Sequence, residues 1–192
     1  MRPLPALVLS LVVGTGLLAG CQASAPPVAV PTSAASLPAA AAPVPADAFR
    51  ARVLRVVDGD TFLADPLSGP AAGRSSVRVR LVAVNAPESV KPDAPVECWG
   101  PQASHALAAL LPPGTRVRAA YEGARHEDEF GRQLWHVWLP DGRFLEDVLV
   151  SAGDVRPVTY AGQDRFALHL SALARTARAS RAGLWGACHA PR

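Results

Sequence analysis

Five short segments with the residue alternation of β-strands limit the folded part of this chain to a small, mainly β domain. Apolar and polar residues alternate along most of their length, as in strands with one buried face. The first two are separated only by Asp58-Gly59-Asp60, a turn sequence that predicts a hairpin. Strands this short need a shared core. The five predicted strands comprise residues 49–57, 61–64, 77–84, 115–121 and 133–139.

Helix-like segments occupy fixed places among these strands. Residues 101–111 start at a proline and stop before Pro112-Pro113, so they predict a helix between the third and fourth strands. Residues 144–152 and 165–181 carry apolar residues at helical spacing and follow the fifth strand. This order predicts a mainly β, α+β fold, a five-stranded OB-fold barrel with about three helices. An SH3-like barrel is the alternative, although it usually lacks the helix between its third and fourth strands.

The N-terminal end has the character of an export signal. Residues 1–21 contain the basic Arg2 and then an apolar run that is too short and wrongly flanked for a transmembrane helix. The run ends in Leu-Ala-Gly-Cys, which resembles the bacterial lipobox and predicts lipidation of Cys21. Ordinary cleavage near Ala23 or Ala25 is the alternative, and it would leave a soluble secreted protein.

Residues 22–48 consist almost entirely of Ala, Pro, Ser and Val, which predicts a disordered tether. Residues 49–188 then form the folded domain, and residues 189–192 form a short tail. We expect an exported cell-envelope lipoprotein, monomeric, whose domain lies outside the cytoplasm and whose only membrane contact is the N-terminal lipid. The net charge of +3 is modest, so it does not by itself indicate a polyanion partner.

The chain has three cysteines. Once Cys21 is assigned to lipid, Cys98 and Cys188 remain as an even pair in an exported chain, where oxidation is expected. A disulfide between them would enclose most of the domain and stabilise it by about 4–5 kcal/mol in the chain-entropy model. The alternatives are a reactive thiol beside His189 and metal ligation. Adjacent residues on a tail rarely form a reactive pair, and no CxxC spacing is present.

Polar side chains gather at strand ends in four clusters. Each cluster alone has an ordinary explanation, such as a hairpin turn or a solvated loop. Together they are more informative, because two arginines and several carboxylates recur at strand ends in one small domain. The clusters are Asp58-Gly59-Asp60-Thr61, Arg80 with Asn85 and Glu88, the segment Asp128-Glu129-Phe130-Gly131-Arg132, and the segment Trp99-Gly100-Pro101-Gln102-Ala103-Ser104.

The order of these motifs resembles that of the staphylococcal-type thermonucleases, which are calcium-dependent phosphodiesterases built on an OB-fold barrel. The matching motifs are VVDGDT, RVRLVAVNAPE, WGPQAS, DEFGRQL and GLW, and they span about residues 52–186. The resemblance implies a nuclease, a hydrolase that cleaves DNA, RNA or both and leaves 3′-phosphate products. It also implies roles for the residues that match.

Three of those residues would be catalytic. Arg80 would bind the scissile phosphate, Glu88 would activate or orient the attacking water, and Arg132 would contact the phosphate and assist the leaving 5′-oxygen. The chemistry suits these residue types, because charge gathers on the nonbridging oxygens as water attacks and a guanidinium fork can contact two oxygens.

The resemblance also implies a Ca²⁺ site. Asp60, Asn85 and the backbone carbonyl of Ala86 would be its ligands, and Asp58 would support it through water. The family usually has aspartate where this chain has Asn85, so we expect weaker calcium affinity. Phe130 is one candidate for stacking on nucleic-acid bases, and Tyr160 is the other.

The remaining aromatic and histidine residues are assigned no role in binding. Trp135 and Trp138 are three residues apart on one strand, so they should face opposite sides, with one of them in the core. The histidines lack convincing ligand spacing, so we do not expect a zinc site. Two other functions stay open: a catalytically weak OB-fold lipoprotein that only binds nucleic acid, and a structural envelope lipoprotein.

Overall fold

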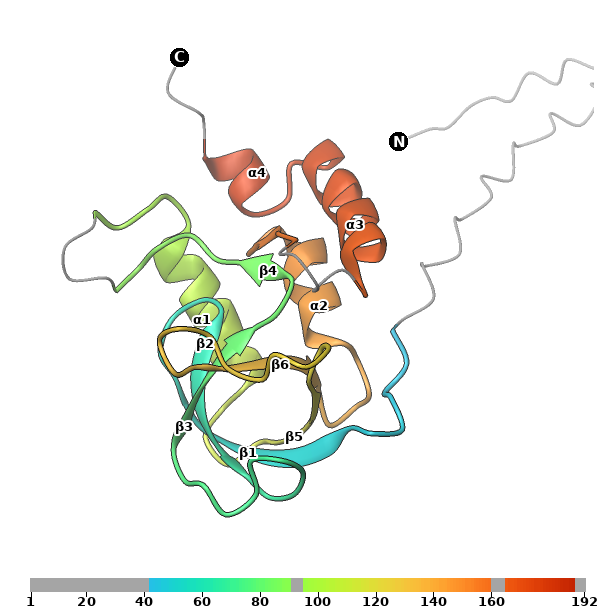
Figure 1. Ribbon diagram of the computed structural model, residues 1–192. Coiled ribbons are helices and arrows are strands. Elements are labelled where there is room, and N and C mark those ends of the chain that lie inside the picture. Colours follow the sequence, from blue (N-terminus) through green and yellow to red (C-terminus); the bar gives the residue numbers. More distant parts are fainter. Residues whose placement is uncertain (1–41, 91–94, 160–164, 189–192) are drawn as a thin grey trace, which may run out of the picture. The chain divides into compact units, whose positions relative to one another are not determined.

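A computed structural model describes residues 42–90, 95–159 and 165–188, and its centre is a closed barrel of five strands (Figure 1). The barrel order is β1-β2-β3-β6-β5, and β5 pairs back onto β1. Only the β3–β6 pair is parallel. The predicted OB-fold barrel is therefore confirmed. The strands are β1 (Phe49–Val56), β2 (Thr61–Pro66), β3 (Val77–Leu81), β5 (Arg116–Ala120) and β6 (Gln133–Trp138).

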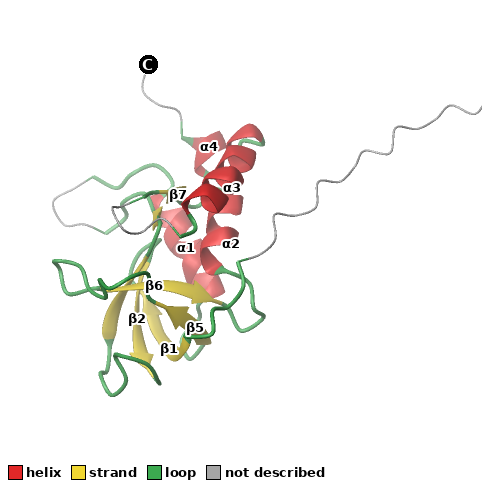
Figure 2. Cartoon of the chain, turned by 45° about the vertical axis from the view of Figure 1, so that its right-hand side comes forward, coloured by secondary structure: helices red, strands yellow, loops and turns green. Residues whose placement is uncertain are grey.

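The described residues form four helices besides the barrel, and the cartoon in Figure 2 shows these helices gathered to one side of it. The helix α1 (Gly100–Leu110) lies in the chain between β3 and β5, and α2 (Leu145–Ala152) and α3 (Ala167–Ala179) follow β6, as expected. The short helix α4 (Leu184–Ala187) was not predicted. At four residues it is too short for a periodicity signal, and it is held by packing against α3.

The predicted third strand is interrupted, which is a correction to the sequence analysis. Barrel pairing stops at Leu81, and Ala83 adopts a left-handed conformation with φ of 61°. The chain then forms β4 (Val84–Asn85), which pairs with β7 (Arg156–Pro157) in a separate two-stranded sheet. The turn directs Asn85 away from the barrel ladder, so that a polar side chain stands beside the end of β3.

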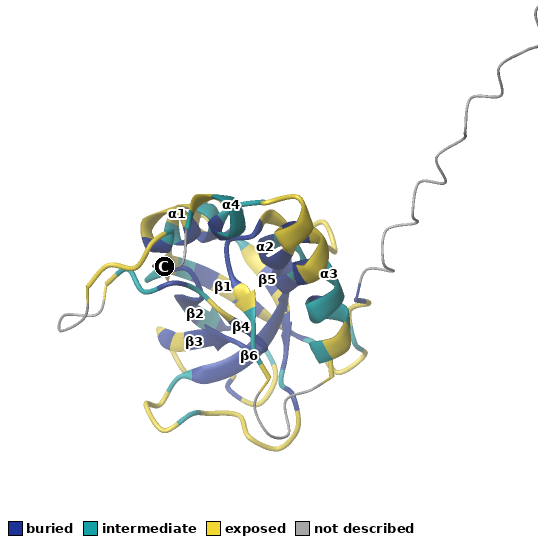
Figure 3. Ribbon diagram, turned by 90° about the horizontal axis from the view of Figure 1, so that it is seen from above, coloured by how far each residue is buried: buried dark blue, intermediate teal, exposed yellow. Residues whose placement is uncertain are grey.

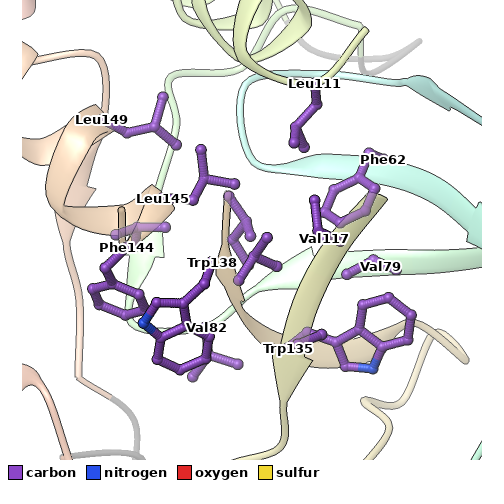
Figure 4. Packing of buried hydrophobic residues seen from close by; sticks show 14 of the residues in the cluster. Phe62, Val79, Val82, Leu111, Val117, Trp135, Trp138, Phe144, Leu145 and Leu149 are labelled. Atoms are coloured by element: carbon purple, nitrogen blue, oxygen red, sulfur yellow. The ribbon is translucent and has the colours of Figure 1, made fainter. Parts of the chain in front are cut away.

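Both strand tryptophans are buried, although we expected only one of them in the core. Trp135 lies on the side of Phe62 and Val79, and Trp138 packs against Phe144 (Figure 4). They do point to opposite faces of β6, but α2 covers the outer face, so all six residues of the strand are buried (Figure 3). The alternation rule fails here because a helix covers what would otherwise be a solvent-facing surface.

Ordered contacts begin before residue 48, where the sequence analysis ended the tether. Ala42 is buried, and its carbonyl accepts a hydrogen bond from Trp138 Nε1 at 2.8 Å. At the other end, Cys98 and Cys188 form a disulfide. The signal segment with Cys21, and residues 189–192, lie outside the described residues. No helix in the part of the chain that is described has the length and apolar character needed to cross a bilayer.

Candidate active site

The hairpin turn between β1 and β2 presents two carboxylates. The backbone N–H of Val57 donates to the carbonyl of Thr61 at 2.8 Å and closes the turn. Gly59 is required inside it, because a Cβ there would lie 2.6 Å from Ala86 Cβ and 2.7 Å from Ala103 Cβ. This close approach seats the turn against the loop after β4 and against α1.

Asp60 is the buried member of the pair, and it joins three parts of the chain. Its Oδ2 accepts the backbone N–H of Ala86 at 2.7 Å and lies 3.2 Å from Arg80 Nη2. Its Oδ1 accepts the Thr61 hydroxyl at 3.0 Å. The carboxylate therefore ties the start of β2 to the end of β3 and to the loop after β4.

Arg80 is held in place on several sides and is only 8% exposed. Besides Asp60, its Nη2 donates to Asn85 Oδ1 at 2.9 Å, and its Nη1 donates to the carbonyl of Leu81. A guanidinium fixed in this way keeps its orientation without a ligand, which is the preorganisation that charge stabilisation requires.

Asn85 and Ala86 supply further oxygen atoms next to Asp60. The amide of Asn85 donates to the Ala86 carbonyl at 3.3 Å, while its oxygen faces Arg80. Asp58 lies across the turn, and its Oδ1 accepts the backbone N–H of Asp60 at 3.0 Å. Burial, together with the neighbouring charge of Asp60, raises the pKa of Asp58 to about 6.

Glu88 is held in the loop that follows β4. Its Oε1 accepts the backbone N–H groups of Ser89 at 2.8 Å and Val90 at 2.9 Å. The backbone of Glu88 is bound in turn by Glu97, one residue before the disulfide-bonded Cys98. The loop is therefore fixed at both of its described ends.

The Trp99–Ser104 segment supports this loop from the start of α1. A Cβ on Gly100 would lie 2.4 Å from the Glu88 carbonyl, so only glycine allows the approach. Trp99 Nε1 donates to Asp154 Oδ1 at 2.9 Å, and the hydroxyls of Ser89 and Ser104 are 2.9 Å apart. The start of α1 therefore packs closely against the backbone of Glu88 and Ser89.

Arg132 lies just before β6. Its Nε donates to Asp128 Oδ2 at 2.6 Å. Burial favours a higher pKa for Asp128, but hydrogen bonds from the backbone and side chain of Arg132 outweigh it and hold the pKa below its usual range. Phe130 is 72% exposed, and its ring lies 5.4 Å from the Arg132 guanidinium carbon.

One pocket of about 560 Å³ brings most of the predicted site residues together. Tyr160 lies outside the described residues. The pocket also includes Glu122 and Arg125, which the sequence analysis did not single out because both belong to a charged loop with no distinctive spacing. The predicted residues that line it are Asp58, Asp60, Arg80, Asn85, Ala86, Glu88, Phe130 and Arg132.

The donor set around Asp60 fits calcium. Within residues 42–90, 95–159 and 165–188, no three His, Cys, Asp or Glu side chains are gathered as a metal site. The donors beside Asp60 are instead a carboxylate, an amide and a backbone carbonyl. Calcium accepts six to eight hard oxygen ligands, including carbonyls and water, whereas zinc prefers nitrogen and sulfur. These residues would suit calcium, and water would be needed to complete its coordination.

Behind the pocket wall lies a buried ionic network that the sequence analysis missed. His136 Nε2 lies 2.9 Å from Glu122 Oε2, and its Nδ1 lies 3.0 Å from Glu146 Oε1. Burial lowers the pKa of His136, but the two carboxylates outweigh it and raise the pKa to about 9. Glu122 also accepts the backbone N–H of Arg165. One sequence feature could have indicated this network: Glu146 is a charged residue on the apolar side of a short helix.

Comparison with known proteins decides the family. Residues 78–187 match the family model described as staphylococcal nuclease homologue. The chain belongs to the staphylococcal nuclease family. It is 33% identical over 133 residues to a thermonuclease of Staphylococcus intermedius, covering 69% of this chain and 74% of that protein.

Two further proteins are similar to this chain to about the same degree. A thermonuclease of Staphylococcus hyicus is 30% identical over 134 residues, covering 70% of this chain and 74% of that protein. An uncharacterized endonuclease of Escherichia coli O157:H7 is 32% identical over 134 residues, covering 70% and 75%. The family-model match begins after Asp60, but an ion pair with Arg80 and a hydrogen bond from the backbone N–H of Ala86 join that residue to the matched region.

Proposed function

We propose that this chain is a calcium-dependent phosphodiesterase that hydrolyses DNA, RNA or both. The observation that carries the proposal is the pocket in which Arg80 and Arg132 face the same space as Asp60 and Glu88. Membership in the staphylococcal nuclease family supports it, since the relatives above bear the names thermonuclease and endonuclease. A pure binding module would have no need of the glutamate.

Arg80 and Arg132 would bind the scissile phosphate. As water attacks phosphorus, negative charge builds on the nonbridging oxygens, and a fixed guanidinium stabilises it without reorganising. Arg80 has this fixed geometry because Asp60 and Asn85 hold it. Arg132, oriented by Asp128, would assist the departure of the 5′-oxygen, so that the product carries a 3′-phosphate.

Glu88 would orient the attacking water and accept its proton. The backbone N–H groups of Ser89 and Val90 fix the orientation of the Glu88 carboxylate by donating to its Oε1. The loop itself packs closely against the start of α1. Removing one charged group of this kind typically lowers the rate by about two to three orders of magnitude.

Asp60, Asn85 and the Ala86 carbonyl would hold calcium, and Asp58 would support it through water. When bound, the ion supplies positive charge beside the phosphate oxygens. The side chain of Asn85 keeps an oxygen but lacks the charge of aspartate, so its contribution to calcium affinity is smaller. Phe130 would stack on a base of the substrate, and Tyr160 is the second candidate for this role.

We also propose that the protein works outside the cytoplasm. The lipobox-like sequence supports lipidation at Cys21, and the Ala/Pro-rich stretch supports a tether that carries a monomeric domain away from the membrane surface. The disulfide is consistent with an oxidising compartment.

A cleavage assay tests the enzymatic function. The purified chain should degrade single-stranded DNA or RNA in calcium and stop when a chelator is added, and Glu88→Ala should lower the rate at least 100-fold. No cleavage at any calcium concentration would refute the enzyme. Intact DNA binding under the same conditions would then support a catalytically weak nucleic-acid-binding module.

A further inference from the structure

The outer face of β1 and β5 carries four arginines in two directly opposed pairs. Arg50 lies opposite Arg118, and Arg52 lies opposite Arg116, in the antiparallel register of the two strands. All four are exposed, while the residues between them point into the barrel. The strands therefore place four guanidinium groups on one face.

Like charges directly opposite each other destabilise a strand pair, so this arrangement needs a compensating partner. Asp65 supplies one for Arg52, at 2.8 Å. Arg118 donates to the carbonyl of Ala48 at 3.2 Å, which leaves its charge uncompensated. Arg50 and Arg116 form no ion pair with any residue that the structure describes. Most of the positive charge on this face therefore remains available to a ligand.

The same arginines border a hollow. Arg50, Arg116 and Arg118 line a depression of about 460 Å³, which has an aliphatic part that includes Val44 and Leu67. These two apolar side chains are 38% and 45% exposed. No residue of the hollow lines the active-site pocket. Guanidinium groups beside an aliphatic surface suit a ligand that combines phosphates with flat, weakly polar rings.

We propose that this arginine surface, made of Arg50, Arg116 and Arg118, binds the phosphodiester backbone of a single-stranded nucleic acid outside the cleavage pocket. The inference rests on the proposed nuclease function and adds a second contact for the same substrate. Alternate residues on one strand are about 6.6 Å apart and opposed residues about 5 Å, so the long side chains can reach neighbouring phosphates. The bases would lie over the aliphatic part of the hollow.

The fold connects this surface to the pocket. β5 carries Arg118 and continues directly to Glu122, which lines the pocket. Four extended residues span about 13 Å. At the start of β1, the ring of Phe49 packs 5.3 Å from that of Tyr121, which holds the two segments together. A substrate strand of several nucleotides can therefore contact both places, and contact outside the pocket would retain a long substrate between cleavage events.

An anionic membrane surface is a less suitable occupant. A bilayer is flat on the scale of a domain, and it would leave the hollow unfilled, whereas a strand can lie in it. A membrane-binding role would be distinguished by loss of binding to anionic vesicles with unchanged binding to DNA.

The test compares two double variants that remove the same charge. Arg50→Gln with Arg116→Gln alters the arginine surface, and Arg175→Gln with Arg181→Gln alters exposed arginines in and after α3. Binding to a fluorescent single-stranded DNA is measured by anisotropy in chelator across a range of salt concentrations. For the first variant, the slope of log affinity against log salt should fall by about 1.4, corresponding to two lost phosphate contacts. For the second it should stay unchanged. In calcium, cleavage of a dinucleotide should be the same for both variants and for the wild type.

Three results would overturn the proposal. Equal losses in the two variants would mean that only net charge matters. A lower rate on the dinucleotide would mean that the variant disturbs the pocket. Loss of binding to phosphatidylglycerol vesicles with unchanged DNA binding would assign the surface to a membrane. If the wild type failed to cleave, the nuclease function would be refuted, but the salt slopes, measured without calcium, would still decide the role of the arginine surface.

Discussion

Glu97 forms hydrogen bonds with both backbone polar groups of Glu88. The backbone N–H of Glu97 donates to the Glu88 carbonyl at 2.8 Å, and the backbone N–H of Glu88 donates to Glu97 Oε2 at 3.1 Å. Glu88 is the residue proposed to orient water, and small displacements of such a group cost large factors in rate. Glu97 is therefore a positioning residue for it.

Replacing Glu97 should lower turnover without weakening substrate binding. We expect Glu97→Ala to reduce kcat by roughly 10- to 100-fold, because the Glu88 backbone loses an acceptor, while KM stays unchanged. Glu97→Gln keeps an oxygen acceptor and should retain most of the activity. Steady-state kinetics on single-stranded DNA measures both constants. A rise in KM with unaltered kcat would contradict this role.

The disulfide should act on the same loop. Cys98 adjoins Glu97, and its bond to Cys188 fixes the loop to the end of α4. We expect the double variant Cys98→Ser, Cys188→Ser to lose about 2–5 kcal/mol of unfolding free energy, measured by urea denaturation. At a temperature where it remains folded, its kcat should also fall. Full activity in the folded variant would show that the bond stabilises the domain without positioning Glu88.

We expect Asn85 to set the calcium concentration that cleavage requires, because its side chain is a proposed calcium ligand. Asn85→Asp adds a negative charge beside Asp60 and restores the usual family residue. We expect the calcium concentration for half-maximal cleavage to fall by roughly tenfold, equivalent to about 1.4 kcal/mol of binding. Asn85→Ala, which removes the oxygen, should raise it. A calcium requirement that neither substitution alters would place Asn85 away from the ion.

The barrel could be predicted from sequence because its strands are short, mostly alternate between apolar and polar residues, and are in part bounded by strong turn signals. Asp58-Gly59-Asp60 and the prolines beside α1 define their boundaries without tertiary information. β4 and β7 could not be predicted in this way. Each has two residues, and their pairing depends on a left-handed Ala83 and on a partner about 70 residues away, so no local pattern indicates them.

The candidate site residues were predicted from motif order, whereas the residues that hold them in place were not predicted. Arg80 and Glu88 lie in a motif shared with a known family, but Glu97 and Asp128 act through hydrogen bonds that only the folded chain shows. The Glu122–His136–Glu146 network was missed for the same reason. A histidine in a strand reads as an exposed polar residue until the helix that covers it is known.

Gly59 should tolerate no side chain. In Gly59→Ala the new Cβ would meet Ala86 and Ala103 at less than 3 Å, so the turn must move away from the site. We expect a loss of about 1–3 kcal/mol in unfolding free energy and a weaker calcium response. Gly73→Ala is a suitable control, since its Cβ meets nothing within 4 Å and only its positive φ is unfavourable. Equal calcium responses in the two variants would contradict the prediction.

His136 makes the stability of the domain depend on pH. Its pKa of about 9 in the folded chain lies above the ordinary value of 6.5, because Glu122 and Glu146 bind the protonated ring. A raised pKa contributes stability that is fully present below about pH 6.5 and is lost as the pH rises through 9. The other groups that pack around the ring are the aromatic side chains of Trp138, Phe144 and Phe166.

The histidine variant tests this dependence. Urea denaturation between pH 6 and pH 9 should show the wild type losing stability across that range. In His136→Gln the part of this stability loss that comes from deprotonation of the histidine should disappear, because the amide does not titrate. At pH 6 the variant should be less stable than the wild type by roughly 3–5 kcal/mol, since two buried carboxylates lose their cation. Parallel pH curves for the two proteins would mean that His136 is neutral in the folded domain, and that the network is held by hydrogen bonds alone.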